Sequence, residues 1–205
     1  MLRSRHYLRR WSQLLSGLFL FGFSAAMMLR ANIGVDPWTV FAEGFNVRWG
    51  FSFGWVIVIS GLAVLLIWIP LRQRPGIGTI LNALLVGPSM EVGLALVETP
   101  ETLPQRIVLF ASGLLMMGIA SGLYIGARFG PGPRDGLMVG FNARFGWPMW
   151  AVRTGVESTV LAIGWALGGT FGVGTIVFAV LIGPLAQRAI IVFRVPDYLT
   201  KSTGT

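Results

Sequence analysis

Apolar residues fill six stretches of the chain that are each long enough to cross a bilayer. A transmembrane helix needs about 20 mainly apolar residues, because each residue advances about 1.5 Å through a hydrocarbon core about 30 Å thick. The pattern therefore predicts an all-α membrane protein with six transmembrane helices. They are expected at roughly residues 12–30, 51–71, 77–97, 107–127, 148–168 and 174–194.

Two connecting segments, residues 33–50 and 129–146, are too polar and too rich in glycine and proline to span. Each nevertheless contains a helix-like run that begins at a proline, Pro37 or Pro133. Proline is favoured at the first helical position because its missing N–H would have no partner there. We therefore expect a short non-spanning helix after the first helix of each half. It could be re-entrant, or it could lie flat at the membrane surface.

The sequence repeats itself after 96 positions. Residues 16–97 align without gaps on residues 112–193, and 25 of the 82 aligned pairs are identical. Apolar composition alone would match leucine with leucine, but it would not match a Gly-Phe-Asn run or two Gly-Pro steps. The chain is therefore a duplicated three-helix unit within one membrane domain, 1–205. Its first copy covers about residues 12–97 and its second about residues 108–193.

Three spanning helices per copy is an odd number, so the second copy must enter the membrane from the opposite side. This predicts a 3+3 inverted-topology repeat. With the N-terminus in the cytoplasm, the cytoplasmic segments hold twelve basic residues and the outer segments three. That distribution follows the positive-inside rule. We therefore expect a multi-pass protein of the cytoplasmic membrane with both termini in the cytoplasm.

Composition agrees with a membrane domain and narrows the chemistry. Of the 205 residues, 54% are hydrophobic and 12% charged, against about 25% charged in soluble domains. The net charge of +8 comes from arginines in short clusters between apolar runs, so the lipid bilayer, and not nucleic acid, is the expected partner. There is no cysteine, and the one histidine is His6. We therefore expect no metal, no cofactor and no enzymatic activity.

Charged residues inside apolar helices are candidate functional groups, because an unpaired charge at membrane depth is strongly unfavourable. Arg153 and Glu157 lie four positions apart on one helical face and can neutralise one another. They form either a structural bridge or the centre of a substrate-linked or proton-linked site. Glu91 and Asn82 in the third span are weaker candidates.

The starts of the two short helices supply three further candidates. Asp36 precedes Pro37 and is a favoured N-cap residue, whereas Arg134 and Asp135 follow Pro133. Discontinuous helices of duplicated transporters direct their N-terminal dipoles at anionic substrate groups. Asp36, Arg134 and Asp135 would then mark where the two short helices meet a substrate.

The run Gly130-Pro131-Gly132-Pro133-Arg134-Asp135-Gly136 carries a resemblance to a known family. Together with the segments 34–38, 172–175 and 182–184, it resembles the YczE/YitT-like bacterial membrane proteins over roughly residues 12–194. The resemblance implies a bacterial cytoplasmic-membrane protein and says little about activity.

Inverted repeats place a pseudo-symmetric binding site near the bilayer midplane. The first hypothesis is therefore a small transporter or permease for a small molecule or ion. Its rival is a non-transporting scaffold or regulatory factor for another membrane or biosynthetic protein, because a duplicated fold does not by itself define a function. The sequence leaves a homo-oligomer open.

Overall fold

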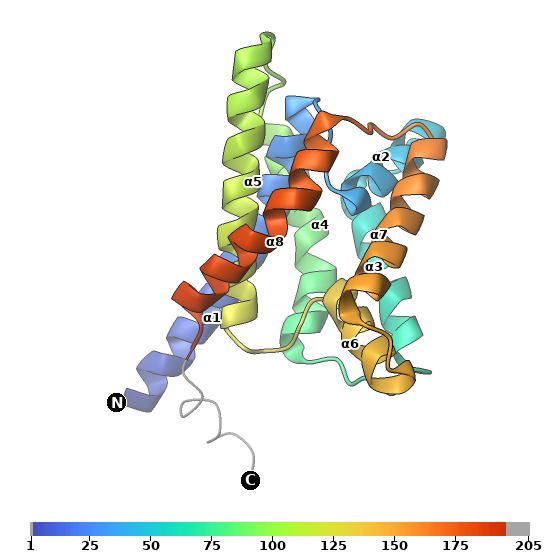
Figure 1. The fold of residues 1–205 in the computed structure, drawn as a ribbon. Helices are drawn as coiled ribbons and strands as arrows, with labels where there is room; N and C mark the ends of the chain where they lie inside the picture. The colour runs from blue at the N-terminus through green and yellow to red at the C-terminus, as the bar shows by residue number, and fades with distance from the viewer. Residues whose placement is uncertain (1, 196–205) are drawn as a thin grey trace.

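The computed structural model describes residues 2–195, and across this range it contains eight α-helices and no strand (Figure 1). The predicted all-α class is confirmed. The helices are α1 (Leu2–Ala31), α2 (Pro37–Trp49), α3 (Phe53–Trp68), α4 (Ile77–Leu96), α5 (Leu103–Gly126), α6 (Pro133–Phe145), α7 (Met149–Ala166) and α8 (Val173–Phe193). The two short helices α2 and α6 begin at Pro37 and Pro133, as expected from the sequence.

Four helices are long and apolar enough to cross a membrane: α1 from Tyr7 onward, α4, α5 and α8. Helix α3 is apolar but has only 16 residues. Helix α7 has 18 residues and carries Arg153 and Glu157. At about 1.5 Å per residue, α3 and α7 are about 24 and 27 Å long, close to the thickness of a hydrocarbon core.

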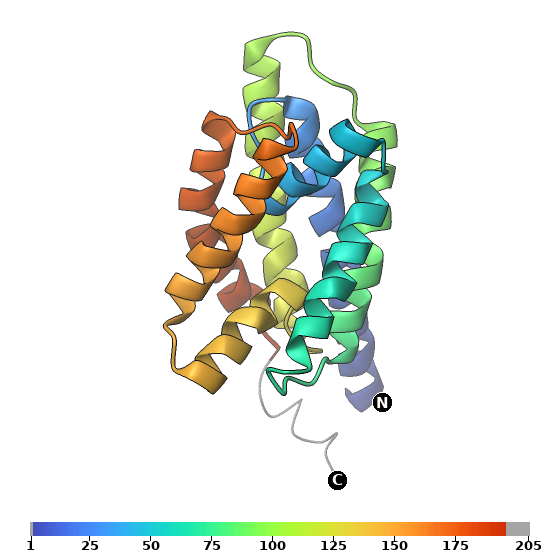
Figure 2. The same cartoon turned by 90° about the vertical axis from the view of Figure 1, so that its right-hand side faces the viewer.

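The helices form two groups (Figures 1 and 2). Helices α4, α1, α5 and α8 pack side by side in that order. Helices α2, α3, α6 and α7 pack against one another and join the first group chiefly through α3 and α4. The helices of the first group approach closely because glycines face their neighbours: a Cβ at Gly22 would lie 2.3 Å from the Val86 carbonyl oxygen, and a Cβ at Gly122 would lie 2.5 Å from Ala189.

The backbone repeats with the same period as the sequence. Every described residue with a positive φ has a partner 96 positions away that also has one. The C-termini of the short helices match as well, because the Asn46 side chain donates to the Phe51 carbonyl and the Asn142 side chain to the Trp147 carbonyl, both at 2.8 Å. The positive-φ pairs are Asn32 with Arg128, Gly34 with Gly130, Gly50 with Gly146, and Arg72 with Gly168.

The two halves also exchange equivalent contacts. The Gly78 amide donates to the Phe129 carbonyl at 3.0 Å, and the Gly174 amide donates to the Ile33 carbonyl at 2.8 Å. Each contact therefore joins the start of the fourth helix of one half to the first loop of the other half. Thr79, the N3 residue of α4, accepts from its N-cap amide at 3.2 Å, as Thr175 does in α8 at 3.4 Å.

Equivalent helices of the two halves run in opposite directions (Figure 1). Helix α1 rises from the N-terminal end of the molecule, and α5 descends beside it. Helices α2 and α6 lie at opposite ends of the molecule (Figure 2). The end of α8 returns to the N-terminal part of α1, where the Gln13 side chain donates to the Phe193 carbonyl at 3.3 Å.

Candidate functional site

A cavity of about 370 Å³ lies between the two groups of helices. Six of the seven residues singled out from the sequence line it: Asp36, Asn82, Arg134, Asp135, Arg153 and Glu157. They come from four different helices or their caps and are brought together only by the fold. The seventh candidate, Glu91, lies apart from the cavity. Its carboxylate accepts from the Gly54 amide at 2.6 Å and so satisfies an N–H at the start of α3.

Asp36 is the N-cap of α2 and is almost fully buried. One carboxylate oxygen accepts from the amides of Trp38 and Thr39, both at 3.2 Å. The other accepts from the Thr39 hydroxyl. These bonds satisfy the free N–H groups of the first turn and hold a negative charge beside the positive end of the helix dipole.

Arg134 brings the start of α6 to the start of α2. Its guanidinium Nη1 lies 4.0 Å from Asp36 Oδ1, and its Cζ lies 4.3 Å from the centre of the Trp38 ring. The α6 start is held in turn by the Trp68 indole, which donates to the Pro133 carbonyl at 3.0 Å. The N-termini of two short helices thus meet inside the molecule, each with a charged side chain at its first turn.

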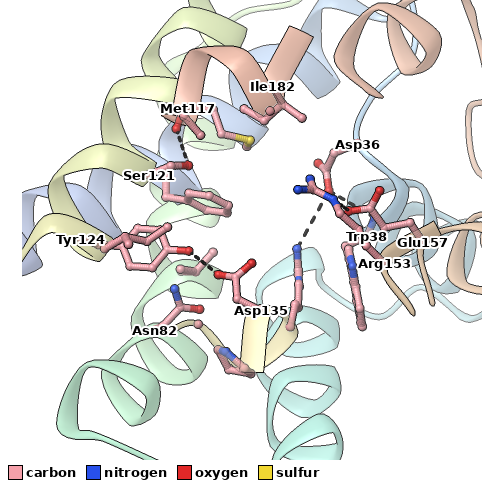
Figure 3. Close-up of a pocket in the computed structure, with 18 of the residues that line it drawn as sticks. Asp36, Trp38, Asn82, Met117, Ser121, Tyr124, Asp135, Arg153, Glu157 and Ile182 are labelled. Carbon is pink, nitrogen blue, oxygen red and sulfur yellow. Dashed lines mark hydrogen bonds and ion pairs between the residues drawn. The ribbon is translucent and has the colours of Figure 1, made fainter. Parts of the chain in front are cut away.

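Tyr124 and Asp135 face one another across another side of the cavity (Figure 3). The tyrosine hydroxyl donates to Asp135 Oδ2 at 2.8 Å. The absence of a side chain at Gly132 makes room for this group, because a Cβ there would lie within 3.4 Å of Asp135, Tyr124 and Asn82. The second carboxylate oxygen of Asp135 has no hydrogen bond to any other described residue and is available to a ligand.

Arg153 and Glu157 form the expected i, i+4 pair on α7, with Arg153 Nε donating to Glu157 Oε1 at 2.9 Å. The pair is not enclosed: the two side chains are 44% and 25% exposed. Both partners belong to one helix, and so their ion pair does not join two helices. It presents both charges to the cavity and to its opening.

The cavity thus combines three carboxylates with two guanidinium groups on walls that are otherwise largely apolar. Such a site can recognise a small polar or charged group by complementary hydrogen bonds and ion pairs. Among the side chains that the structure describes, residues 7–195, no three Asp or Glu cluster as metal ligands would.

Residues 8–190 match the model of a family described as one of unknown function, DUF6198. The chain belongs to the DUF6198 family. An uncharacterised protein of Haemophilus influenzae is 35% identical to it over 186 residues, which cover 90% of this chain and 85% of the relative. The uncharacterised membrane protein YczE of Bacillus subtilis is 32% identical over 176 residues, covering 85% of this chain and 82% of YczE. No solved structure matches the chain.

The YczE-like resemblance is thereby confirmed, and this DUF6198 protein is a membrane protein like YczE. The uncharacterised protein YyaS of Bacillus subtilis is a more distant relative, 21% identical over 173 residues that cover 82% of this chain and 86% of YyaS. The names of these relatives assign no substrate or activity.

The site of this DUF6198 protein includes residues that the sequence did not single out. Tyr124 and Trp38 make direct contacts with Asp135 and Arg134. Tyr124 carried a usable signal, because it is the one tyrosine of three that lies inside a predicted span. Nothing in the sequence marked Trp38 as a site residue, because an aromatic residue in a short helix equally fits the membrane surface.

Two further polar contacts hold the fold and not the cavity. Arg10 near the N-terminus is buried, and its Nε donates to the Ala127 carbonyl at 3.0 Å. It thereby satisfies a carbonyl at the end of α5. Glu43 on α2 accepts from the amide of Thr170 at 2.6 Å and from its hydroxyl at 2.8 Å. This contact fixes the loop that leads into α8.

Proposed function

We propose that this DUF6198 protein is a small transporter whose substrate binds in the central cavity. The observation that carries the proposal is the meeting of two short-helix N-termini, with Asp36 and Arg134, in a cavity that also holds Asp135, Arg153 and Glu157. Transporters with inverted repeats bind their substrates at broken helices of this kind, near the bilayer midplane. The chain itself would carry out no chemical reaction.

The proposal includes a membrane topology of six spans in a 3+3 inverted repeat, with α2 and α6 re-entrant. It is supported by the matched positive-φ residues, by the exchanged contacts between halves and by the opposite directions of equivalent helices. The buried N-terminal turn of α2 favours a re-entrant helix over one lying flat on the membrane surface. The arginine distribution favours cytoplasmic termini.

Single cysteines test this topology, because the chain has no cysteine of its own. Thr99 lies between α4 and α5, and Gln73 between α3 and α4. In intact cells, a membrane-impermeant maleimide is expected to label Thr99→Cys, which would face outward, and not Gln73→Cys. In inside-out vesicles the pattern should reverse. Labelling of both positions from one side would rule out an α4 that spans.

The rival function, a non-transporting scaffold, has less support. A scaffold needs a closed and well-packed interior, whereas this interior contains a cavity that reaches five charged side chains. A structural bridge would also join different helices, whereas Arg153 and Glu157 pair within α7. Charged groups retained at membrane depth without such a bridging role are a mark of substrate or ion pathways.

Uptake into proteoliposomes tests transport directly. The panel should contain labelled anionic, cationic and neutral metabolites together with short-chain amphiphiles. We expect at least one of them to accumulate with the parent protein, and Asp36→Asn to slow its uptake by about tenfold or more, equivalent to about 1.4 kcal/mol. Asparagine is as good an N-cap as aspartate, so this variant keeps the α2 start. It loses the charge that faces Arg134 and the oxygen that accepts from the Thr39 hydroxyl.

Two controls complete the uptake experiment. Asp36→Asn should still melt cooperatively in detergent, well above the temperature of the uptake assay, which separates lost uptake from lost folding. Glu98→Asn in the exposed loop between α4 and α5 should transport like the parent. A panel in which no compound crosses faster than through protein-free vesicles would argue against transport and for the scaffold.

A further inference from the structure

The seam between the third and fourth helices is closed in the first half of the molecule. Gly54 and Gly61 let α3 approach α4: a Cβ at Gly87 would lie 2.4 Å from the Gly54 carbonyl oxygen, and a Cβ at Gly61 would lie 3.4 Å from Ala83. Small residues of this kind allow two membrane helices to pack backbone to backbone. Helix α3 accordingly packs along α4.

The equivalent seam between α7 and α8 is open. The positions that match Gly54 and Gly61 carry Trp150 and Glu157, a large side chain and a charged one. Helix α7 instead packs against α2 and α6. On α8, a Cβ added at Gly183 would have no atom of another helix within 4 Å, whereas a Cβ at the equivalent Gly87 would clash with α3. The opening therefore follows from the residues that differ between the two copies.

A groove of about 500 Å³ occupies this seam. Its walls are mainly apolar and include Trp150, Leu161 and Val180. It adjoins the central cavity, since Arg153 and Glu157 line both. The groove thus leads from the outer surface of the helix bundle, the side that a membrane protein turns to lipid, to the polar centre.

Arg153 determines which chemistry suits this groove. Its Nε is paired with Glu157, whereas its two terminal nitrogens have no hydrogen bond to another described residue. Glu157 lies at the middle of α7. Contact between lipid chains and an ionised pair at this depth is strongly unfavourable. The two terminal nitrogens of a guanidinium fit the two oxygens of a phosphate or carboxylate. An oxyanion would therefore satisfy the exposed part of Arg153.

We infer that the α7–α8 groove is a lateral portal through which an amphiphile with an oxyanion headgroup reaches the central cavity from the bilayer. The headgroup pairs with Arg153, and the acyl chain lies between the apolar walls of α7 and α8. The inference rests on the proposed function and narrows its substrate class. Charge complementarity at Arg153 favours this occupant over the transmembrane helix of a second copy, which would present hydrocarbon to the pair.

Binding of oleoyl lysophosphatidate in dodecyl maltoside tests the portal, with the dissociation constant measured by native mass spectrometry. Ala179 is exposed on α8 and lines the groove. We expect Ala179→Phe to fill the groove and weaken binding by about tenfold or more, or about 1.4 kcal/mol. The matched control is Ala63→Phe, at an exposed position of α3 that lines a different groove, between α3 and α7. It should bind like the parent.

A second variant and a second ligand keep the result decisive if Ala179→Phe folds poorly. Arg153→Gln/Glu157→Gln keeps a neutral hydrogen-bonded pair and should also weaken binding. Glycerol 3-phosphate carries a comparable headgroup without a chain, and we expect it to bind far more weakly. Unchanged lysophosphatidate binding in both variants would overturn the portal. Glycerol 3-phosphate that binds as tightly as lysophosphatidate, in the parent and in Ala179→Phe alike, would also overturn it. Conversion of a dimer to a monomer by Ala179→Phe, without lysophosphatidate binding, would also overturn it and assign the groove to a second copy.

The portal and the transport function fail in different ways. Blocked lysophosphatidate binding in Ala179→Phe, without movement of any panel compound across vesicles, would leave the portal standing and remove transport. Uptake of a water-soluble compound by the parent protein, together with lysophosphatidate binding that Ala179→Phe leaves unchanged, would leave transport standing and remove the portal.

Discussion

Glu157→Gln alone is expected to destabilise the protein by about 1–2 kcal/mol. In the proposed six-span topology it leaves the partly exposed Arg153 guanidinium without its counter-charge within the membrane. Uptake should be lost in the same variant. The measurement is thermal melting in detergent beside proteoliposome uptake. Glu98→Gln is the matched control, because it makes the same change in an exposed loop and should leave both readouts unchanged.

The double variant Arg153→Leu/Glu157→Leu separates stability from function. Replacing an ion pair with apolar residues of similar size is often neutral for stability, so the double variant should melt close to the parent. It should nevertheless remain inactive in uptake, because the charges that face the cavity are gone. Recovery of both stability and uptake in the double variant would make the pair dispensable. Parental melting and uptake in both single variants, Glu157→Gln and Arg153→Gln, would remove the pair from the site.

The sequence predicted the parts of the fold that local patterns control. Pro37 and Pro133 marked the starts of the short helices because proline is suited to the first helical turn. The 96-residue repeat anticipated equivalent helices, and the backbone repeats with the same period down to its positive-φ residues. The i, i+4 spacing of Arg153 and Glu157 anticipated their ion pair.

Long-range packing could not be predicted in the same way. Nothing in the local pattern around Tyr124 indicates that its hydroxyl meets Asp135, because that contact depends on how α6 folds back into the bundle. Glu91 looked like a candidate for the site because it is acidic and lies in a span, but its position relative to α3 makes it a partner for the Gly54 amide.

The open α7–α8 seam shows a similar limit. The alignment displays Trp150 opposite Gly54 and Glu157 opposite Gly61, yet a substitution alone does not reveal which helix seam it faces. The structure shows that Gly54 lies against Gly87 where α3 packs on α4. The equivalent substitutions in the second half therefore belong to the seam between α7 and α8. The open groove therefore depends on the residues that differ between the two copies, and not on those that repeat.

In the proposed transport function, the cavity between the two groups of helices is a substrate site that water reaches. Ser121 lines this cavity, whereas Ser24 is fully buried on α1 and does not. The two serines are otherwise well matched, since each donates its hydroxyl to a carbonyl of its own helix, at 2.8 and 2.7 Å. Cysteine fits either position with little change in volume.

The most direct measurement is therefore modification of Ser121→Cys and Ser24→Cys by a small cationic methanethiosulfonate, applied separately to each side of the membrane. We expect Ser121→Cys to react from both sides, as alternating access to one site requires, and Ser24→Cys to react from neither. A folded Ser121→Cys protein that is as unreactive as Ser24→Cys from both sides would mean a dry, closed bundle and would contradict the proposed substrate site.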